Sequence, residues 1–290
     1  MVMKLKEMVA ETQSILLELD SEASELFCVA EKKLSDRDYS AIRSIWQACR
    51  IIDDDIVALS SAGRYWSGTI LLRSIFDGTA KLSFLLSSKD ISERDRRFDC
   101  YCEYSREKDI ASLEQSSVHL LNDGEYGRGV REEYVRDTII RQINEEKTQP
   151  GHGERNRTVA NELTYKRITA KLLEEFPVWK FFKENVDNRY ARANGYSHLN
   201  SWACEDIART ILNEVHKQSS DQDLEAKMSI HLVDVCVLKR VRCEAMLHAF
   251  GTSDERFCSV MKRHKQFLDF SVSLANSKVA EIMSDKGGRQ

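Results

Sequence analysis

The sequence contains few residues that interrupt helices. Only two prolines, Pro150 and Pro177, and 12 glycines occur among its 290 residues. Proline removes a backbone donor and glycine loosens the backbone, so their scarcity argues against a sheet with many turns and favours long helices. Hydrophobic residues make up 42% of the chain, enough for a sizeable core. We therefore predict an all-α fold that forms one domain over residues 1–290.

The chain also lacks an excess of charge of either sign. Its 43 basic and 47 acidic side chains leave a net charge of -4, so no global basic field attracts nucleic acid or an anionic membrane. Any RNA contact must then be local. No stretch approaches 18 uncharged apolar residues, and the N-terminal segment does not resemble a signal peptide. We expect a cytoplasmic protein without membrane contact.

Patterns that bind metal are also missing. The eight cysteines include no CxxC pair, and Cys100 and Cys102 have no partner ligands at zinc spacing. Asp53, Asp54 and Asp55 are consecutive, and on a helix they fan out by about 100° each instead of converging on one ion. We interpret them as a solvated face. The expectation is free thiols in a reducing cytosol, no metal and no cofactor.

Apolar residues recur with helical spacing along most of the chain. The segment 65–86 is the most apolar, and we expect it at the centre of a bundle. The segment 147–163 contains two glycines, one proline and little apolar material, so it is predicted to be a loop. Helices are predicted over residues 3–33, 36–59, 65–86, 91–121, 128–146, 164–175, 201–217, 219–250 and 253–283.

The segment from Arg192 to His198 places a permanent cation and a titratable imidazole close together in sequence. On an unbroken helix, residues six apart point about 120° away from each other. Asn194 and Gly195 both tolerate a positive φ and form a strong local turn signal. We therefore predict that the helix breaks at Asn194-Gly195 and that Arg192 and His198 face one crevice.

Such a pair suits RNA transesterification, in which negative charge builds up on a phosphate. His198 would move protons, and Arg192 would hold the phosphate through its planar guanidinium. Arg189 and Tyr190, about one turn earlier, would extend the same surface. The alternative is structural: Arg192 pairs with a nearby acid such as Asp187, and His198 caps a turn.

A second arginine lies inside the most apolar helix. Arg73 precedes Asp77 by four residues, so the two share a helix face and an ion pair is the default expectation. The functional alternative makes Arg73 a second arginine that faces phosphate. Two further pairs are expected to be surface or packing residues: Arg242 with His248, and Arg209 with His216.

With these residues identified, the chain resembles the HEPN superfamily (higher eukaryotes and prokaryotes nucleotide-binding), and more closely an uncharacterised bacterial HEPN-like family. The likeness rests on LLRSIFDGTAKLSFLL (71–86) and RYARANGYSHLNSW (189–202). It covers about residues 40–220, a HEPN-like helical core, with residues 221–285 as a C-terminal helical extension. The chain departs from the family pattern at Ala193, where a polar residue usually follows the arginine.

The resemblance implies a metal-independent endoribonuclease that acts as a toxin-like or anti-phage defence effector. Such proteins work as homodimers that bring two Arg-His pairs into one cleft, and an antitoxin or defence-complex partner would regulate them. Arg192 and His198 would then be catalytic. The supporting or phosphate-binding residues would be Arg189, Asn194, Tyr196, Ser197, Arg73 and Asp77.

Two alternatives to the ribonuclease remain open. One is a non-catalytic helical interaction or regulatory subunit of a bacterial defence or toxin-antitoxin complex, with the segments 222–250 and 253–283 binding a partner. The other is a HEPN-like nucleotide-binding domain without cleavage. Catalysis predicts that Arg192 and His198 are exposed in a shared cleft, whereas the interaction hypothesis predicts that they are paired or buried.

Overall fold

A computed structural model describes most of the first hundred residues and several later segments. The described residues form helices and turns and contain no strand, which confirms the all-α fold. They divide into two compact units, residues 1–88 with 172–290 and residues 89–171. None of the described helices is long and apolar enough to cross a bilayer. The described ranges are 5–103, 141, 144–145, 162–180, 190, 193–194, 197–198, 204–205, 207–208 and 221–251.

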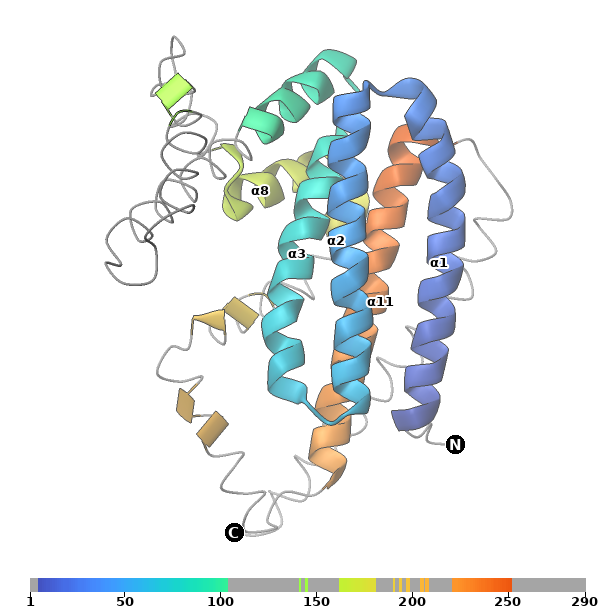
Figure 1. Cartoon of the computed structure of the whole chain (residues 1–290), viewed down its shortest axis with the longest axis vertical. Helices are drawn as coiled ribbons and strands as arrows, with labels where there is room; N and C mark the ends of the chain where they lie inside the picture. The colour runs from blue at the N-terminus through green and yellow to red at the C-terminus, as the bar shows by residue number, and fades with distance from the viewer. Residues whose placement is uncertain are drawn as a thin grey trace. The chain divides into compact units, whose positions relative to one another are not determined.

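Four long helices of the first unit lie side by side (Figure 1). They are α1 (Leu5–Lys33), α2 (Asp36–Ser61), α3 (Tyr65–Ser87) and α11 (Asp221–Phe250). Helix α2 packs against both α1 and α3, and α11 packs against all three of the others. The periodicity of apolar residues predicted each of these helices, with ends that agree within about two residues.

Local sequence signals set the boundaries of α2. The hydroxyl of Ser35 accepts a hydrogen bond from the backbone N–H of Asp38 at 3.2 Å, and so satisfies a donor that the first helical turn leaves free. Asp36 adds negative charge at the positive end of the helix. Beyond its C-terminus, Gly63 adopts a φ of 72°, the left-handed conformation that glycine accepts without strain.

Helix α3 packs tightly against α2 at Gly78. A Cβ atom at that position would collide with the sulfur of Cys49 on α2 and reach Ile45 at 3.9 Å. The glycine is therefore required by the close approach of the two helices and not by its φ. Phe76 and Leu82, on either side of it in α3, are almost fully buried. Among the described helices α3 packs against α2 and α11, whereas α2 and α11 each pack against three, so the central position expected for α3 stays a prediction.

The centre of the bundle contains charged groups as well as apolar ones. Asp53 on α2 is fully buried and forms an ion pair with Arg242 on α11, whose Nη1 donates to the hydroxyl of Thr79 on α3 at 3.2 Å. The prediction that all three consecutive aspartates are solvated is thus wrong for Asp53, although Asp54 and Asp55 are exposed. The reason is a partner far away in the sequence that periodicity does not show.

Burial has opposite effects on these two groups. It raises the pKa of the Asp53 carboxyl to about 6, because desolvation outweighs the attraction of Arg242 and Lys239. Desolvation acts to lower the pKa of Arg242, but the nearby Asp53 more than compensates, so its pKa is raised and it stays charged. Lys239, also on α11, lies 2.8 Å from a carboxylate oxygen of Asp20 on α1. Charged contacts thus join α11 to both α1 and α2.

Helix α11 is surrounded on nearly all sides. Between Lys227 and Phe250, the range over which its side chains are described, His248 is the one exposed residue. The thiols of Cys236 and Cys243 are buried, and desolvation raises the pKa of each to about 12. They behave as small hydrophobic groups, as the sequence predicted for most of the cysteines.

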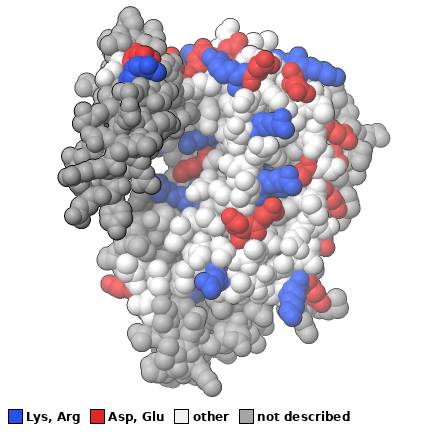
Figure 2. Space-filling model, viewed as in Figure 1, with Lys and Arg blue, Asp and Glu red and all other residues white. Residues whose placement is uncertain are grey.

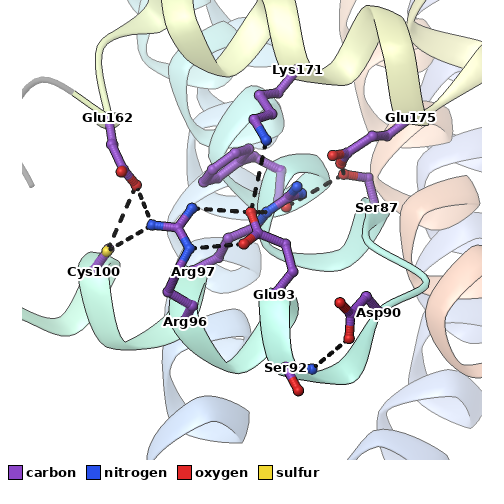
Figure 3. Close-up of polar contacts among 11 residues, drawn as sticks. Ser87, Asp90, Ser92, Glu93, Arg96, Arg97, Cys100, Glu162, Lys171 and Glu175 are labelled. Carbon is purple, nitrogen blue, oxygen red and sulfur yellow. Dashed lines mark hydrogen bonds and ion pairs between the residues drawn. The ribbon is translucent and has the colours of Figure 1, made fainter.

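The second unit contains a helix over residues 91–103 and most of α8 (Tyr165–Glu175). Glu93 is the hub of its polar contacts, as Figure 3 shows. One carboxylate oxygen accepts from Nε of Arg96 at 2.8 Å, and the other accepts from Nη2 of Arg96 and from Nε of the fully buried Arg97, both at 3.0 Å. Arg96 also contacts Glu162 at 2.6 Å.

These donors stabilise the charged form of Glu93. Hydrogen bonding by Arg96, followed by that of Arg97, lowers the pKa of Glu93 to about 2 in spite of some desolvation. Lys171 lies 4.0 Å away and adds a third cation. The cluster therefore ties the helix at 91–103 to residue 162 and to α8 within this unit.

The chain leaves the first unit and returns to it at one place. The hydroxyl of Ser87, at the end of α3, donates to the carboxylate of Glu175 at 3.2 Å, and both residues belong to the first unit (Figure 3). The second unit is therefore inserted between two adjacent points of the bundle. The predicted helices at 128–146, 201–217 and 253–283 and the loop at 147–163 lie largely or wholly outside the described residues.

Candidate functional site

Arg73 occupies a half-buried position on α3, and its guanidinium reaches a segment more than a hundred residues further along the chain. Its Nη1 donates to the hydroxyl of Ser197 at 3.0 Å and lies 2.9 Å from Nε2 of His198. His198 is exposed, whereas Ser197 is half-buried. An arginine and a histidine thus meet at this surface. The arginine is Arg73 of α3, the helix that the sequence shows to be the most apolar.

The hydroxyl of Ser197 both donates and accepts a hydrogen bond. It donates its single hydrogen to the backbone carbonyl of Asn194 at 2.9 Å, so it can only accept from Arg73. Asn194 therefore takes part in the site through its carbonyl. Because the Ser197 hydrogen is already engaged, the residue is suited to positioning Arg73 and not to acting as a nucleophile.

Asp77 and Tyr190 support Arg73 from the other side. The carboxylate of Asp77 lies 3.9 Å from Nε of Arg73, which confirms the predicted ion pair, and it accepts a hydrogen bond from the hydroxyl of Tyr190 at 3.1 Å. Burial and the charge of Asp77 raise the pKa of Tyr190, while Arg73 opposes that rise. Phe76 packs edge-on against the Tyr190 ring, with centroids 6.0 Å apart.

The helix does not end where the turn signal predicted. Asn194 is helical, and the backbone N–H of His198 donates to its carbonyl at 3.2 Å, the spacing of an α-helix. The predicted break at Asn194 is therefore wrong; the described turn falls at His198. Ala193 is fully buried. An apolar contact with the protein interior overrides the turn preference of the next residue, and it also explains why no polar side chain stands at this position.

The predicted site lies partly among the described residues. Arg192, Arg189 and Tyr196 lie outside the described residues, as do Arg209 and His216. The described members Arg73, Asp77, Asn194, Ser197 and His198 are brought together, and Tyr190 joins them. The condition under which Arg192 was expected to face His198, a break at Asn194, is not met.

The rival pair in α11 diverges, as predicted. Arg242 points to the buried Asp53, whereas Nε2 of His248 lies 3.1 Å from the carbonyl oxygen of Ser87.

Two further observations concern metal ligands and surface charge. Within the described part of the chain no three His, Cys, Asp or Glu side chains are grouped as metal ligands. Basic and acidic side chains are interspersed on the face of the described helices that Figure 2 shows.

The geometry defines what the cluster can do chemically. Arg73 has a fixed positive charge and an exposed edge, and it can bind an oxyanion through charge-assisted hydrogen bonds. His198 supplies an exposed imidazole at the same place, a group that can serve as a general acid or base. A phosphate at Arg73 would therefore lie within reach of that imidazole.

Comparisons with family models, with curated proteins and with solved structures found no match to this chain.

Proposed function

We propose that this protein is a metal-independent endoribonuclease of HEPN type that acts as a toxin-like or anti-phage effector. The observation that carries the proposal is the 2.9 Å contact between Arg73 and the exposed imidazole of His198. His198 takes the proton from a ribose 2′-hydroxyl, which attacks the adjacent phosphorus. The bond from phosphorus to the 5′ oxygen breaks, and a proton is returned to that oxygen. The products are a 2′,3′-cyclic phosphate and a 5′-hydroxyl end.

Arg73 holds the phosphate and balances the charge that builds up on its oxygens. Arg192 is retained in the proposal as a second phosphate ligand, supplied by the same chain or by the second subunit of a homodimer. Asp77 and Tyr190 act through Arg73: the carboxylate attracts the guanidinium, and the tyrosine hydroxyl orients the carboxylate. No step requires a metal or a cofactor.

Within the described part of the chain, the structure offers less support for an interaction subunit. That hypothesis assigns partner binding to the segments 222–250 and 253–283. The second segment lies outside the described residues, whereas α11 packs against three helices and exposes no apolar side chain between Lys227 and Phe250. His198 is exposed, as the catalytic hypothesis predicts, and it is also paired with Arg73, as the interaction hypothesis predicts. The covered face of α11 is therefore the observation that favours the enzymatic proposal.

The test is incubation of purified protein with total RNA and with a tRNA pool in excess EDTA. We expect wild-type protein to leave 2′,3′-cyclic phosphate ends and His198→Ala to lose about a hundredfold or more of the rate, since general acid-base catalysis typically contributes that much. His248→Ala, which removes another exposed imidazole, is the matched control and should cleave normally. Wild-type protein that leaves both RNA pools intact would contradict the proposal.

The melting temperature separates a catalytic role from a structural one. Because His198 is exposed, His198→Ala should melt within a few degrees of wild type. Arg73→Ala should also lose cleavage. A large fall in stability of His198→Ala would indicate that this histidine is structural.

A further inference from the structure

The hydrogen bonds of His198 determine which of its ring nitrogens carries the proton. The guanidinium of Arg73 can only donate, because it has no lone pair available to accept. Its 2.9 Å contact with Nε2 of His198 therefore requires Nε2 to be the acceptor. The ring is then neutral with its hydrogen on Nδ1, and the lone pair of Nε2 is occupied by Arg73.

Two other histidines have the opposite arrangement. Nε2 of His248 lies 3.1 Å from the carbonyl oxygen of Ser87, which can only accept, so Nε2 carries the hydrogen. Nε2 of His231 lies 3.0 Å from the hydroxyl of Thr69, whose own hydrogen is donated to a backbone carbonyl at 3.1 Å. In that arrangement Nε2 of His231 is also a donor. The role of Nε2 therefore differs among the three histidines: it accepts in His198 and donates in His231 and His248.

Arg73 can exchange its present hydrogen-bond acceptors for a phosphate oxygen. Its Nη1 uses both of its hydrogens, one for the Ser197 hydroxyl and one for His198, and both acceptors are uncharged. Among the described residues, Arg73 forms its ion pair with Asp77, whose carboxylate oxygen lies 3.9 Å from Nε, too far for a hydrogen bond. The side chain of Arg73 is 30% exposed. A phosphate oxygen is a stronger acceptor than a hydroxyl or a neutral imidazole, so it would displace them.

We infer that Arg73 is a receptor for the phosphate group of a phosphodiester and that its occupancy controls His198. Without a ligand, the guanidinium blocks the lone pair of Nε2. When a phosphate oxygen takes over Nη1, that lone pair becomes free to accept a proton. The consequence for catalysis rests on the proposed function, whereas the binding step and the release of Nε2 do not.

The coupling gives the site a simple selectivity. The base becomes available only when an oxyanion is already bound beside it, so the nucleophile is activated next to a phosphate. Asp77 and Tyr190 contribute as positioning residues: the tyrosine hydroxyl holds one carboxylate oxygen at 3.1 Å, which keeps the carboxylate near the guanidinium without a direct hydrogen bond from Nε.

Long-range proton-nitrogen NMR spectra of the full chain test the inference, recorded near pH 8, where an ordinary imidazole is neutral. In ligand-free protein we expect the Nδ1–H pattern at His198 and the Nε2–H pattern at His248. Inorganic phosphate, titrated at constant ionic strength, should remove the Nδ1–H pattern of His198 and leave His248 unchanged. A 2′-deoxy dinucleotide, which cannot cleave itself, should do the same if a phosphodiester is recognised, whereas a response to inorganic phosphate alone would limit the receptor to free phosphate and overturn the assignment to phosphodiesters.

Variants identify the group that responds. Arg73→Ala should show the tautomer mixture of free imidazole at His198, and its half-saturating phosphate concentration should rise by at least about tenfold, as expected for the loss of a hydrogen bond to a charged group. Arg50→Ala removes an exposed arginine that pairs with Asp20 at 3.3 Å on another part of the bundle, and it should behave as wild type. If Arg73→Ala fails to fold, the phosphate titration of wild-type protein still decides the matter.

The outcomes separate this inference from the proposed function. An Nε2–H pattern at His198 in ligand-free protein, or a tautomer that phosphate does not change, would overturn the coupling even if RNA is cleaved. A phosphate-dependent change without RNA cleavage would support the receptor and contradict the ribonuclease proposal.

Discussion

Arg242 and Asp53 show how a single residue can stabilise or destabilise the bundle. Removing one member of a buried ion pair leaves a charge that neither water nor a partner compensates, a loss of typically about 3 to 5 kcal/mol. We expect Arg242→Met to lower the free energy of unfolding by about this amount near pH 7. The loss should be smaller near pH 5, because Asp53 can then take up a proton. Urea unfolding at the two pH values measures it.

The double variant Asp53→Leu with Arg242→Met is the control for that prediction. It replaces the ion pair by apolar side chains of similar size, which is often neutral or stabilising. Most of the lost stability should therefore return. A double variant no more stable than Arg242→Met alone would show that packing, and not the unpaired charge, dominates.

Asp53 also gives the folded protein a pH dependence of definite sign. Its pKa is about 6 in the folded state, against an ordinary value of 3.8. Between these values the folded state holds a proton that the unfolded state has lost, so this contribution to stability falls as the pH rises from about 4 to about 6. The advantage of wild-type protein over Asp53→Asn should shrink across that window and stay level above it. Urea unfolding of wild-type protein and Asp53→Asn at a series of pH values measures the difference in their free energies of unfolding. An increase of this difference with pH would contradict the prediction.

The residue scale is also where sequence reasoning was least complete. Spacing alone identified Arg73 with Asp77, because residues four apart share a helix face. It did not identify the contact of Arg73 with His198, whose partners are 125 residues apart, or the burial of Asp53 by Arg242 at a separation of 189. Helical periodicity describes one element, and such contacts depend on how two elements meet.

At the scale of elements, the close approach of α2 and α3 makes a test possible. Gly78→Ala adds a methyl group that collides with the sulfur of Cys49. Alanine is favoured over glycine in a helix by about 1 kcal/mol, but overpacking a core typically costs about 1 to 3 kcal/mol. We expect Gly78→Ala to lower the melting temperature. Cys49→Ala combined with Gly78→Ala should recover it, and a Gly78→Ala variant that is more stable than wild type would contradict the packing argument.

The elements themselves were largely predictable. α1, α2, α3 and α11 follow from apolar residues at helical spacing, and Ser35 and Gly63 mark boundaries through local chemistry. The predicted turn at Asn194 failed because a turn preference is weak beside the burial of the neighbouring Ala193. Local sequence signals predicted the helix boundaries at Ser35 and Gly63 correctly. They failed at Asn194, where tertiary packing outweighs the local preference.

At the scale of the whole molecule, the second unit is an insertion in the sequence of the first. The chain leaves the first unit after Ser88 and returns to it at Leu172. Because Ser87 and Glu175 are in contact, a short linker can join the two points. We expect a variant with residues 89–171 replaced by about eight glycines and serines to keep helical circular dichroism and one cooperative unfolding transition. Loss of the transition would show that the bundle depends on the inserted unit. The prediction of one domain over the whole chain stays a prediction.

The position of α11 also has a consequence for synthesis on the ribosome. Asp53 and Asp20 leave the exit tunnel long before their partners on α11, Arg242 and Lys239. The 189 residues between Asp53 and Arg242 take about 10 to 40 s to translate at about 5 to 20 residues per second. During that interval the nascent segment of α1, α2 and α3 carries the Asp53 carboxylate without Arg242, and it exposes the apolar surface that α11 covers in the folded protein. Ribosome-bound chains that end before α11 should therefore be the form of this protein most dependent on chaperones.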